Sequence, residues 1–305
     1  MNKRSEIRPD WIAVDWGTTN LRAWAIGQGQ VLAELTSDDG MGKLPRDGFE
    51  PALLRLIEPW LESRPPVVAC GMVGSRQGWC EAPYRTTPCA PLDQAALVQA
   101  PTTDPRLRVS IAPGLKQTAP ADVMRGEETQ IAGALALMSG YDGVFCLPGT
   151  HTKWVHISAG EVVSFQTFMT GEMFALLSEA SVLRHGMQGG GWDDAAFDIG
   201  VSDALSRPER IGARLFSLRA EGLVAGLAPA AARSRLSGLL IGTELAAARP
   251  YWLGQRVTLI GAEKLSAAYA RALAVQGVAT DMLSATACTL AGLSTLALQT
   301  EAAPQ

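Results

Sequence analysis

The chain has 305 residues, of which 47% are hydrophobic and 18% charged, and its formal net charge is −4 at pH 7. This composition is typical of a globular protein, and a slightly acidic chain has no electrostatic basis for binding nucleic acid or an anionic membrane surface. The length exceeds what one hydrophobic core usually supports, so we expect two domains.

Cysteine usage and the start of the chain favour a cytoplasmic protein. The five cysteines are an odd number and include no CxxC pair, so the sequence predicts neither a disulfide framework nor a zinc site. The first residues, MNKRSEIRPD, are polar and lack the apolar core of a signal peptide. No window approaches the roughly 18 uninterrupted apolar residues that a membrane span needs.

Residues 11–26 are predicted to form a β-hairpin with a tight polar turn. An apolar run ends in Asp15, the turn Gly17-Thr18-Thr19 follows, and a second apolar run completes the hairpin. Gly17 lets the backbone approach a phosphate, and the hydroxyls of Thr18 and Thr19 can donate hydrogen bonds to its oxygens. Asp15 can hold Mg²⁺ directly or through water. The alternative is an ordinary hairpin turn, because all three residue types favour turns.

The rest of the first half alternates between strand and helix patterns. Apolar spacing predicts, in chain order, a strand at 31–35, a helix at 49–63, strands at 67–73 and 109–112, and a helix at 127–138. Residues 79–105 are rich in Pro and Thr and are interpreted as a connection. The break at 140–143 is taken as the boundary between domains 1–140 and 141–305.

The second half begins with the same pattern as the first. An apolar run at 144–147 is followed by Pro148-Gly149-Thr150-His151-Thr152-Lys153, then by strands at 154–157 and 162–168. This repeated order indicates a duplication, and two such turns facing each other across a cleft could clamp a polyphosphate. His151 is interpreted as a hydrogen-bond donor at the turn. Lys153 either reaches a phosphate or points to solvent.

The remaining segments complete an α/β pattern in the second half. They are predicted as a helix at 172–183, a Gly-rich loop at 186–191, helices within 195–248, a strand at 256–260, a helix at 264–275 and a last apolar helix at 281–298, which can pack back on the first domain. Gly261-Ala262, between strand and helix, could hold a nucleotide base, although tight packing explains the glycine equally well. The loop ending at Trp192 is either a lid or a linker.

Two further segments carry candidate catalytic and substrate-binding groups. Asp122, Glu127 and Glu128 form an acidic cluster before or at a helix start. One of them could accept the proton of a hydroxyl during phosphoryl transfer, whereas helix capping is the alternative. Ser75 and Arg76 follow a buried strand, where a cation could bind an anionic substrate. Arg76 could equally be a surface residue.

The sequence resembles the 2-dehydro-3-deoxygalactonokinase family, within the sugar kinase, actin and heat-shock protein superfamily. The blocks that carry the resemblance are VDWGTTNLRAW, GMVGSRQGW, DVMRGEETQIAGAL, LPGTHTKWV, FMTGEMFALLSEASVL and GLLIGTEL. The resemblance implies two domains of ribonuclease H-like fold, each opening with a phosphate-binding hairpin, with a nucleotide between them. The second turn departs from the commoner Asp-Gly-Gly form, having Pro148-Gly149-Thr150 after Leu147.

The resemblance also implies an activity, its cofactors and the roles of several residues. The family transfers the γ-phosphate of ATP to the terminal hydroxyl of 2-dehydro-3-deoxy-D-galactonate, in galactonate catabolism. Residues 15–19 and 149–153 would hold phosphates and Mg²⁺, Gly261-Ala262 approximates the adenosine motif, and the 122–128 block lies where superfamily members often keep the catalytic carboxylate. The alternatives are a phosphohydrolase on the same fold and a nucleotide-dependent switch. The expected partner is a small sugar acid, and a homodimer is one option for the assembly.

Overall fold

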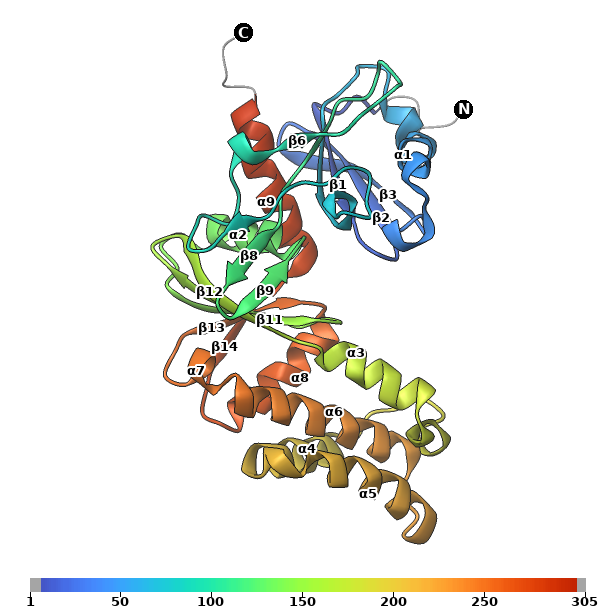
Figure 1. The fold of residues 1–305 in the computed structure, drawn as a ribbon, viewed down its shortest axis with the longest axis vertical. Coiled ribbons are helices and arrows are strands. Elements are labelled where there is room, and N and C mark those ends of the chain that lie inside the picture. Colours follow the sequence, from blue (N-terminus) through green and yellow to red (C-terminus); the bar gives the residue numbers. More distant parts are fainter. Residues whose placement is uncertain (1–6, 301–305) are drawn as a thin grey trace. The chain divides into compact units, whose positions relative to one another are not determined.

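The computed structural model describes residues 7–300 (Figure 1). The chain divides into two compact units. Unit 1 comprises Met1–Tyr141, Ser158–Ser164 and Ala285–Gln305, whereas unit 2 comprises Asp142–Ile157 and Phe165–Ser284. The last helix therefore belongs to the first unit, although it follows the second unit in sequence.

The sheet of unit 1 has the strand order β3-β2-β1-β4-β7-β6. Its strands are β1 (Trp11–Trp16), β2 (Leu21–Gly27), β3 (Gln30–Ser37), β4 (Val67–Gly71), β6 (Val98–Gln99) and β7 (Val109–Ile111). β1 and β2 pair antiparallel, as the predicted hairpin requires, and β3 continues antiparallel from β2. β1, β4 and β7 run parallel, so their carboxyl ends lie at one edge of the sheet.

The sheet of the second half repeats this topology. Its order is β12-β11-β10-β13-β14, with β10 (Gly143–Leu147), β11 (Thr152–Ser158), β12 (Glu161–Phe168), β13 (Val257–Gly261) and β14 (Thr280–Ser284). β10 is antiparallel to β11 and parallel to β13, which is parallel to β14. Counted along the chain, the strands of this sheet lie in the order 3-2-1-4-5, which is that of the ribonuclease H-like fold. The unit 1 sheet has the same order, with β7 in the fifth place and the short strand β6 added at its edge. The predicted α/β class and the internal repeat are thus confirmed.

Helices cover the sheets of both units. Unit 1 contains α1 (Phe49–Ile57), α2 (Glu127–Leu137) and α9 (Ala285–Thr300). Unit 2 contains α3 (Thr170–Ala175), α4 (Asp194–Ser206), α5 (Ile211–Val224), α6 (Pro229–Ala247), α7 (Arg249–Trp252) and α8 (Glu263–Ala274). In Figure 1 α4, α5 and α6 lie together as a helical layer. None of the helices described is long and apolar enough to cross a membrane.

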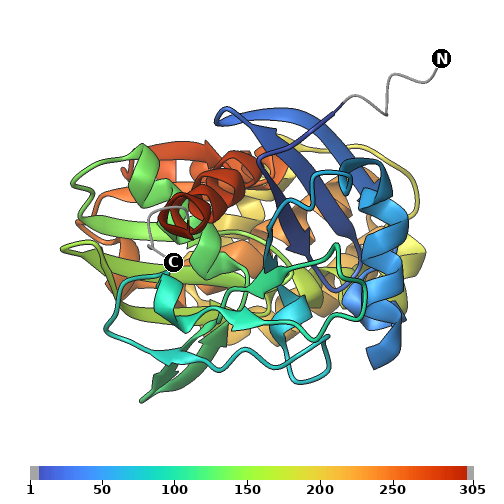
Figure 2. The ribbon, with the colours of Figure 1, turned by 90° about the horizontal axis from the view of Figure 1, so that it is seen from above.

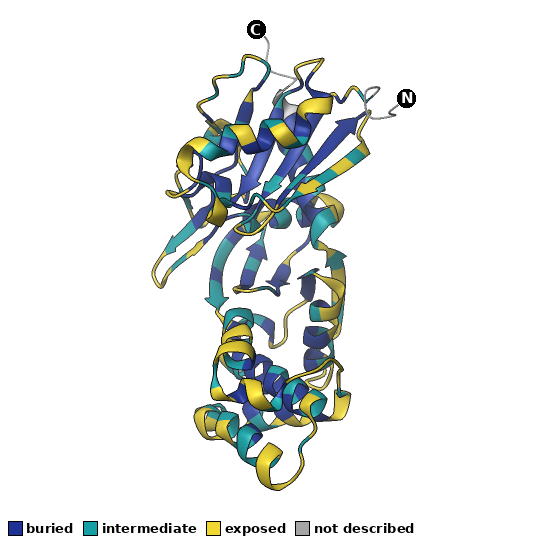
Figure 3. Ribbon diagram, turned by 90° about the vertical axis from the view of Figure 1, so that its right-hand side faces the viewer, coloured by how far each residue is buried: buried dark blue, intermediate teal, exposed yellow. Residues whose placement is uncertain are grey.

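The two faces of the unit 1 sheet bury alternate residues of β1. Ile12, Val14 and Trp16 pack against α1. Ala13, on the opposite face, packs in a cluster with Leu293 of α9. In Figure 3 the central strands of this sheet are mostly dark blue while the outer side of α1 is yellow, as expected for a helix that covers a sheet. The sheet is therefore enclosed by α1 on one face and α9 on the other.

Three expected elements differ in the structure because tertiary contacts override local pattern. The helix predicted at 281–298 is wrong at its start: residues 280–284 form β14, whose hydrogen-bonding partner is the exposed edge of β13. The helix predicted at 49–63 ends at Ile57, since Pro59 cannot donate a helical hydrogen bond. The helix predicted at 172–183 begins as α3 and continues as a π-helical turn, Leu176–Ala180.

A small sheet in unit 1 was not predicted. β5 (Arg85–Thr86), β8 (Leu115–Thr118) and β9 (Ala121–Met124) form it in the order β5-β8-β9. β8 and β9 are a hairpin whose strands contain several polar residues, so their apolar alternation is weak. One consequence is that Asp122 lies on a strand and not at a helix start.

α2 and α9 are in direct backbone contact, which only glycine permits. Figures 1 and 2 both show α9 beside α2. A Cβ built on Gly133 would lie 1.8 Å from the carbonyl oxygen of Cys288, and one built on Gly292 would lie 2.0 Å from the carbonyl oxygen of Thr129. The carboxyl-terminal helix is thus fixed to α2 at a spacing that any side chain at these positions would increase.

Replacing Gly292 with Val is expected to destabilise the protein by about 2–3 kcal/mol, because the added methyl groups must separate α2 from α9. The matched control is Gly222→Ala in α5, where a Cβ meets no atom within 4 Å. That variant should gain up to about 1 kcal/mol from helix propensity. Chemical denaturation of both variants measures the difference, and equal stability would contradict the helix contact.

Candidate active site

The first hairpin turn is held in place by a second segment of unit 1. The backbone N–H of Met41 donates to the carbonyl oxygen of Gly17 (3.0 Å), and that of Gly42 donates to Thr18 (2.9 Å). Gly40 is required there, since its Cβ would lie 2.1 Å from the carbonyl carbon of Thr19. The side chains of Thr18 and Thr19 stay exposed. The turn is therefore rigid at its backbone and open at its hydroxyls.

Asp15 lies at the end of β1, directly before this turn. It faces Arg22 across the hairpin and forms an ion pair with it. Arg22 also donates to Thr286 Oγ1 at the start of α9 (3.3 Å). The side chain of Asp15 is 18% exposed, so the carboxylate is oriented by Arg22 while remaining accessible.

The carboxyl end of β4 and the start of α2 come together beside Asp15. Gly71 ends β4 with φ +92°, and its Cβ would lie 2.7 Å from the carbonyl oxygen of Trp16 and 3.4 Å from Asp15 Oδ1. Gly126, with φ +106°, precedes α2, and its Cβ would lie 3.4 Å from Gly71 Cα. Both conformations favour glycine. The acidic first turn of α2 is thereby positioned next to the hairpin.

Buried Cys70, which pairs with Asp15 across β1 and β4, interacts with the charges of both Asp15 and Glu128. Burial raises the pKa of its thiol well above the usual value, and the negative charges of Asp15 and Glu128 raise it further. Two carboxyl groups from separate segments therefore act on one side chain at this end of the sheet.

The structure distinguishes the three candidate catalytic carboxylates. Glu128 is completely buried, and its carboxyl accepts hydrogen bonds from the N–H of Gly126 (2.6 Å) and from Thr129 Oγ1 (3.2 Å). Burial, together with the charge of Glu127, raises the pKa of Glu128 to about 8. Glu128 is therefore mostly protonated at neutral pH, when it cannot accept a proton.

Glu127 and Asp122 lie at different distances from the contact between Gly71 and Gly126. Glu127 is partly exposed, and its Oε2 accepts from the backbone N–H of Arg125 (3.1 Å). Asp122 lies on β9, and its Oδ1 accepts from the N–H of Val123 (2.7 Å). Three residues of extended strand correspond to about 10 Å, so Asp122 is well separated from Arg125. The capping alternative also holds, because Glu127 and Glu128 both accept backbone N–H groups near the start of α2.

Ser75 and Arg76, predicted together as substrate-binding residues, lie in different environments. The Arg76 side chain is 79% exposed and its Nε lies 3.7 Å from Glu81 Oε1. This geometry supports the surface alternative for Arg76. Ser75 is buried, and its hydroxyl has no hydrogen-bond partner within the described residues.

The second hairpin turn, in unit 2, is supported in the same way as the first. The N–H of Glu172 donates to the carbonyl oxygen of Thr150 (2.9 Å), and a Cβ on Gly171 would lie 2.2 Å from the carbonyl oxygen of Gly149. His151 Nε2 lies 2.6 Å from Glu172 Oε2, which accords with the predicted hydrogen-bonding role. Lys153 is only 5% exposed, so the solvent-facing alternative for it is wrong.

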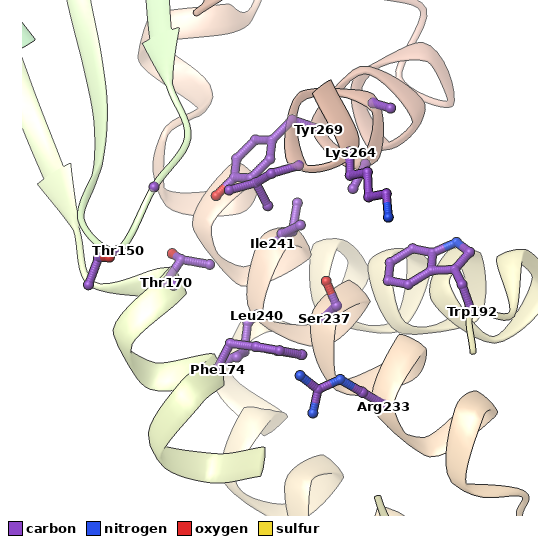
Figure 4. A pocket seen from close by; sticks show the side chains of 15 residues that line it. Thr150, Thr170, Phe174, Trp192, Arg233, Ser237, Leu240, Ile241, Lys264 and Tyr269 are labelled. Carbon is purple, nitrogen blue, oxygen red and sulfur yellow. The ribbon is translucent and has the colours of Figure 1, made fainter. Parts of the chain in front are cut away.

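Next to this turn, unit 2 contains a cavity of about 740 Å³. Helices α3, α6 and α8 form most of its wall, with Gly149 and Thr150 at one side and Trp192 at another (Figure 4). The lining is mostly apolar, with a few polar groups that include Arg233 and Lys264, as is usual for sites that bind organic ligands. Gly261 and Ala262 lie directly before α8, whose first turns line the cavity.

A buried carboxyl group, that of Glu244 on α6, connects several elements around this cavity through hydrogen bonds. It accepts hydrogen bonds from Trp154 Nε1 (2.7 Å), from the Tyr269 hydroxyl (2.8 Å) and from Thr170 Oγ1. Burial raises the pKa of Glu244 to about 7, against the opposing effect of these hydrogen bonds. Because Thr170 and Tyr269 line the cavity, the network holds β11, α3 and α8 at fixed positions around it.

Comparisons with known proteins decide the family. The family model described as 2-keto-3-deoxy-galactonokinase matches residues 15–296. The chain belongs to this family. A Rhizobium meliloti (strain 1021) protein named "Probable 2-dehydro-3-deoxygalactonokinase" is 40% identical over 296 residues, covering 94% of this chain and 96% of the relative. The Escherichia coli (strain K12) 2-dehydro-3-deoxygalactonokinase is 35% identical over 292 residues, covering 94% and 97%.

A solved structure agrees with the family. The crystal structure of a Sinorhizobium meliloti protein assigned as a 2-dehydro-3-deoxygalactonokinase matches with a TM-score of 0.87 and 39% identity, covering 95% of this chain and 99% of the other. The resemblance seen in the sequence is thus confirmed. The chain is a phosphotransferase of the sugar-acid kinase family, with ATP as the phosphate donor.

Several residues around these sites were not predicted from the sequence. The sequence pattern around Arg125 predicts no separate role for it, yet its side chain is buried beside Gly74. A cation just before two acidic residues could have drawn attention to it. Arg233, Lys264 and Glu244 lie on helices whose pattern shows only which face is buried, so no local signal connects them with a cavity.

The raised pKa of Glu128 predicts a pH-dependent stability. In the unfolded chain this group ionises near its ordinary value of 4.5, whereas in the fold it stays neutral up to about pH 8. Its stabilising contribution is complete below about pH 4.5 and is lost as the pH rises toward 8. Without ligands, Glu128→Gln should therefore gain stability relative to wild type between pH 5 and pH 8.5, on the order of 3 kcal/mol.

Urea denaturation of both proteins at these two pH values measures the change, with circular dichroism spectra as the control for an intact fold. A difference in stability that does not vary with pH would contradict a neutral, buried Glu128.

Proposed function

We propose that this protein transfers the γ-phosphate of ATP to the terminal (6-) hydroxyl of 2-dehydro-3-deoxy-D-galactonate, in galactonate catabolism. The observation that carries the proposal is the close approach of Gly126, Gly71 and Asp15, because it joins a phosphate-type turn to an acidic helix start within unit 1. Phosphoryl transfer needs this combination of phosphate positioning and a proton acceptor. Family membership supports the substrate.

ATP-binding groups are proposed for each unit by itself. The unit 2 cavity would take the adenosine, because its apolar walls suit a base and its volume of about 740 Å³ accommodates a nucleoside. Its edge is formed by Gly149 and Thr150, so phosphates would extend toward the second turn. In unit 1, the exposed hydroxyls of Thr18 and Thr19 are proposed to bind phosphate oxygens.

Mg²⁺ is proposed as the metal, with Asp15 as its protein contact. Mg²⁺ is usually held by one or two carboxylates together with phosphate oxygens and water, so a single accessible carboxylate fits. Arg22 now neutralises Asp15 and would keep it oriented when the ion binds. When bound, the ion would neutralise charge on the β- and γ-phosphates.

Glu127 is proposed as the proton acceptor. It is partly exposed and lies next to the Gly71–Gly126 contact, whereas Glu128 is protonated and Asp122 lies on a distant part of β9. In the step, the hydroxyl oxygen forms a bond to the γ-phosphorus and the bond to the β,γ-bridging oxygen breaks. The hydroxyl proton passes to Glu127, and ADP leaves.

The phosphohydrolase and switch alternatives predict different products. We expect ADP release to depend on 2-dehydro-3-deoxygalactonate and to equal the sugar phosphate formed. Release of inorganic phosphate without the sugar acid would support the hydrolase instead. Slow ADP release that only a protein partner changes would support the switch.

The proposal extends to the location and assembly. We propose a cytoplasmic location, where ATP is supplied. A homodimer and the absence of a nucleic-acid partner stay predictions from the sequence.

Replacing Asp15 with Asn is expected to lower kcat by at least about 100-fold, because the metal contact is lost while the size of the side chain is kept. Glu127→Gln should lower kcat by about 100-fold through loss of the proton acceptor. Asp122→Asn is the matched control and should keep nearly wild-type kcat. Steady-state kinetics with the sugar acid measures all three, and a large loss in Asp122→Asn alone would reassign the base.

Filling the unit 2 cavity should weaken ATP binding. Ser237 lines the cavity from α6, so Ser237→Phe would place a ring where the adenosine is proposed to bind. KM for ATP should rise at least about tenfold, while KM for the sugar acid changes little. Ser202→Phe, at an exposed position of α4, is the matched control. An unchanged KM for ATP in Ser237→Phe would place the nucleotide elsewhere.

A further inference from the structure

Arg125 is a buried cation, and two of its guanidinium nitrogens have no hydrogen-bond acceptor in the described part of the chain. It is 8% exposed, and its Nη2 donates to the carbonyl oxygen of Ala82 (2.8 Å). The guanidinium carbon lies 4.3 Å from the centre of the Tyr84 ring. Nε and Nη1 are enclosed and lack any hydrogen-bond acceptor within residues 7–300. Burying such donors unpaired is costly, so a ligand that pairs with them is the expected explanation.

A second unpartnered polar group lies next to this guanidinium. A Cβ on Gly74 would be 2.9 Å from Arg125 Nη1, so the guanidinium packs against the residue that precedes Ser75. Ser75 is 5% exposed and its hydroxyl also lacks a partner in the described residues. Two buried side chains with unused donors, from two separate segments, thus lie in the same part of unit 1.

The charge of Arg125 acts on nearby Glu128 and opposes the rise in its pKa, but no hydrogen bond joins the Glu128 carboxyl to the two unused guanidinium nitrogens. Glu127 accepts a hydrogen bond from the backbone N–H of Arg125. Glu128 binds the N–H of Gly126 and Thr129 Oγ1. Nε and Nη1 of Arg125 can therefore donate to an anionic ligand. An arginine side chain presents a planar pair of donors that matches the two oxygens of a carboxylate.

We propose that Arg125 and Ser75 form the subsite for the carboxylate of the sugar acid. This rests on the proposed function, and it assigns the substrate cation to Arg125 in place of exposed Arg76. Arg125 is separated from Glu127 by a single residue, so one short segment would anchor the acid end of the substrate and supply the proton acceptor. The Tyr84 ring covers the guanidinium and must shift when the carboxylate enters.

Ser75→Ala is the sharpest test, because the Ser75 hydroxyl has no hydrogen-bond partner among residues 7–300 whose loss would destabilise the fold. KM for the sugar acid should rise about tenfold, while KM for ATP and the melting temperature stay unchanged. Arg125→Lys keeps the charge but loses the paired donors, and should raise the same KM by at least about tenfold. Arg76→Ala is the matched control and should behave as wild type.

A neutral substrate analogue, the C1 amide of the sugar acid, separates recognition of the carboxylate from general damage. Ser75→Ala and Arg125→Lys should both reduce the preference of kcat/KM for the acid over the amide. A purely structural role for these residues would lower both values equally and would overturn the inference. If Arg125→Lys does not fold, Ser75→Ala decides.

The outcomes also separate this inference from the proposed function. If wild type phosphorylates the sugar acid and both variants keep its KM within twofold, the subsite is wrong and the function stands. If KM for ATP rises instead, the unpaired donors serve the nucleotide and the inference is overturned. If wild type shows no ADP release that depends on a sugar acid, the proposed function fails and this subsite fails with it.

Discussion

The structure depends most on one backbone contact at the carboxyl edge of the unit 1 sheet. Gly71 touches the end of β1 and Gly126 touches Gly71, so three segments far apart in sequence meet with no side chain between them. A Cβ at Gly71 would strike the carbonyl oxygen of Trp16. This contact brings Asp15 close to the start of α2, where Glu127 and Glu128 lie directly after Gly126. The same backbone contact at Gly71 therefore determines both the packing of these three segments and the position of the proposed catalytic groups.

The duplication extends beyond strand order to the way each turn is held. In unit 1, Gly40 allows a neighbouring segment to contact the backbone of the first turn, and in unit 2, Gly171 does the same for the second. In both cases a backbone N–H from that segment donates to a carbonyl oxygen of the turn. Thr18, Thr19 and Thr150 are exposed on turns whose backbones are held by these hydrogen bonds. Preorganised donors of this kind suit phosphate oxygens.

The local sequence pattern was sufficient to predict those elements whose hydrogen-bonding partners are close in sequence. The hairpin at 11–26 and its counterpart at 144–157 were predicted because apolar alternation and turn residues fix them. β14 was missed because its partner, β13, lies about twenty residues away in sequence and supplies the hydrogen bonds. The same limit applies to the site: burial neutralises Glu128 and isolates Arg125, and burial is set by long-range packing that the block DVMRGEE does not reveal.

A crystal structure with the sugar acid and a non-hydrolysable ATP analogue tests the placement of the acceptor site in unit 1 most directly. The substrate carboxylate should lie within hydrogen-bond distance of the Arg125 guanidinium and the Ser75 hydroxyl. Its terminal hydroxyl should lie within hydrogen-bond distance of Glu127, with Asp15 on the metal side of the phosphates. A sugar acid bound with its carboxylate at Arg76, or with its terminal hydroxyl at Asp122, would contradict this placement.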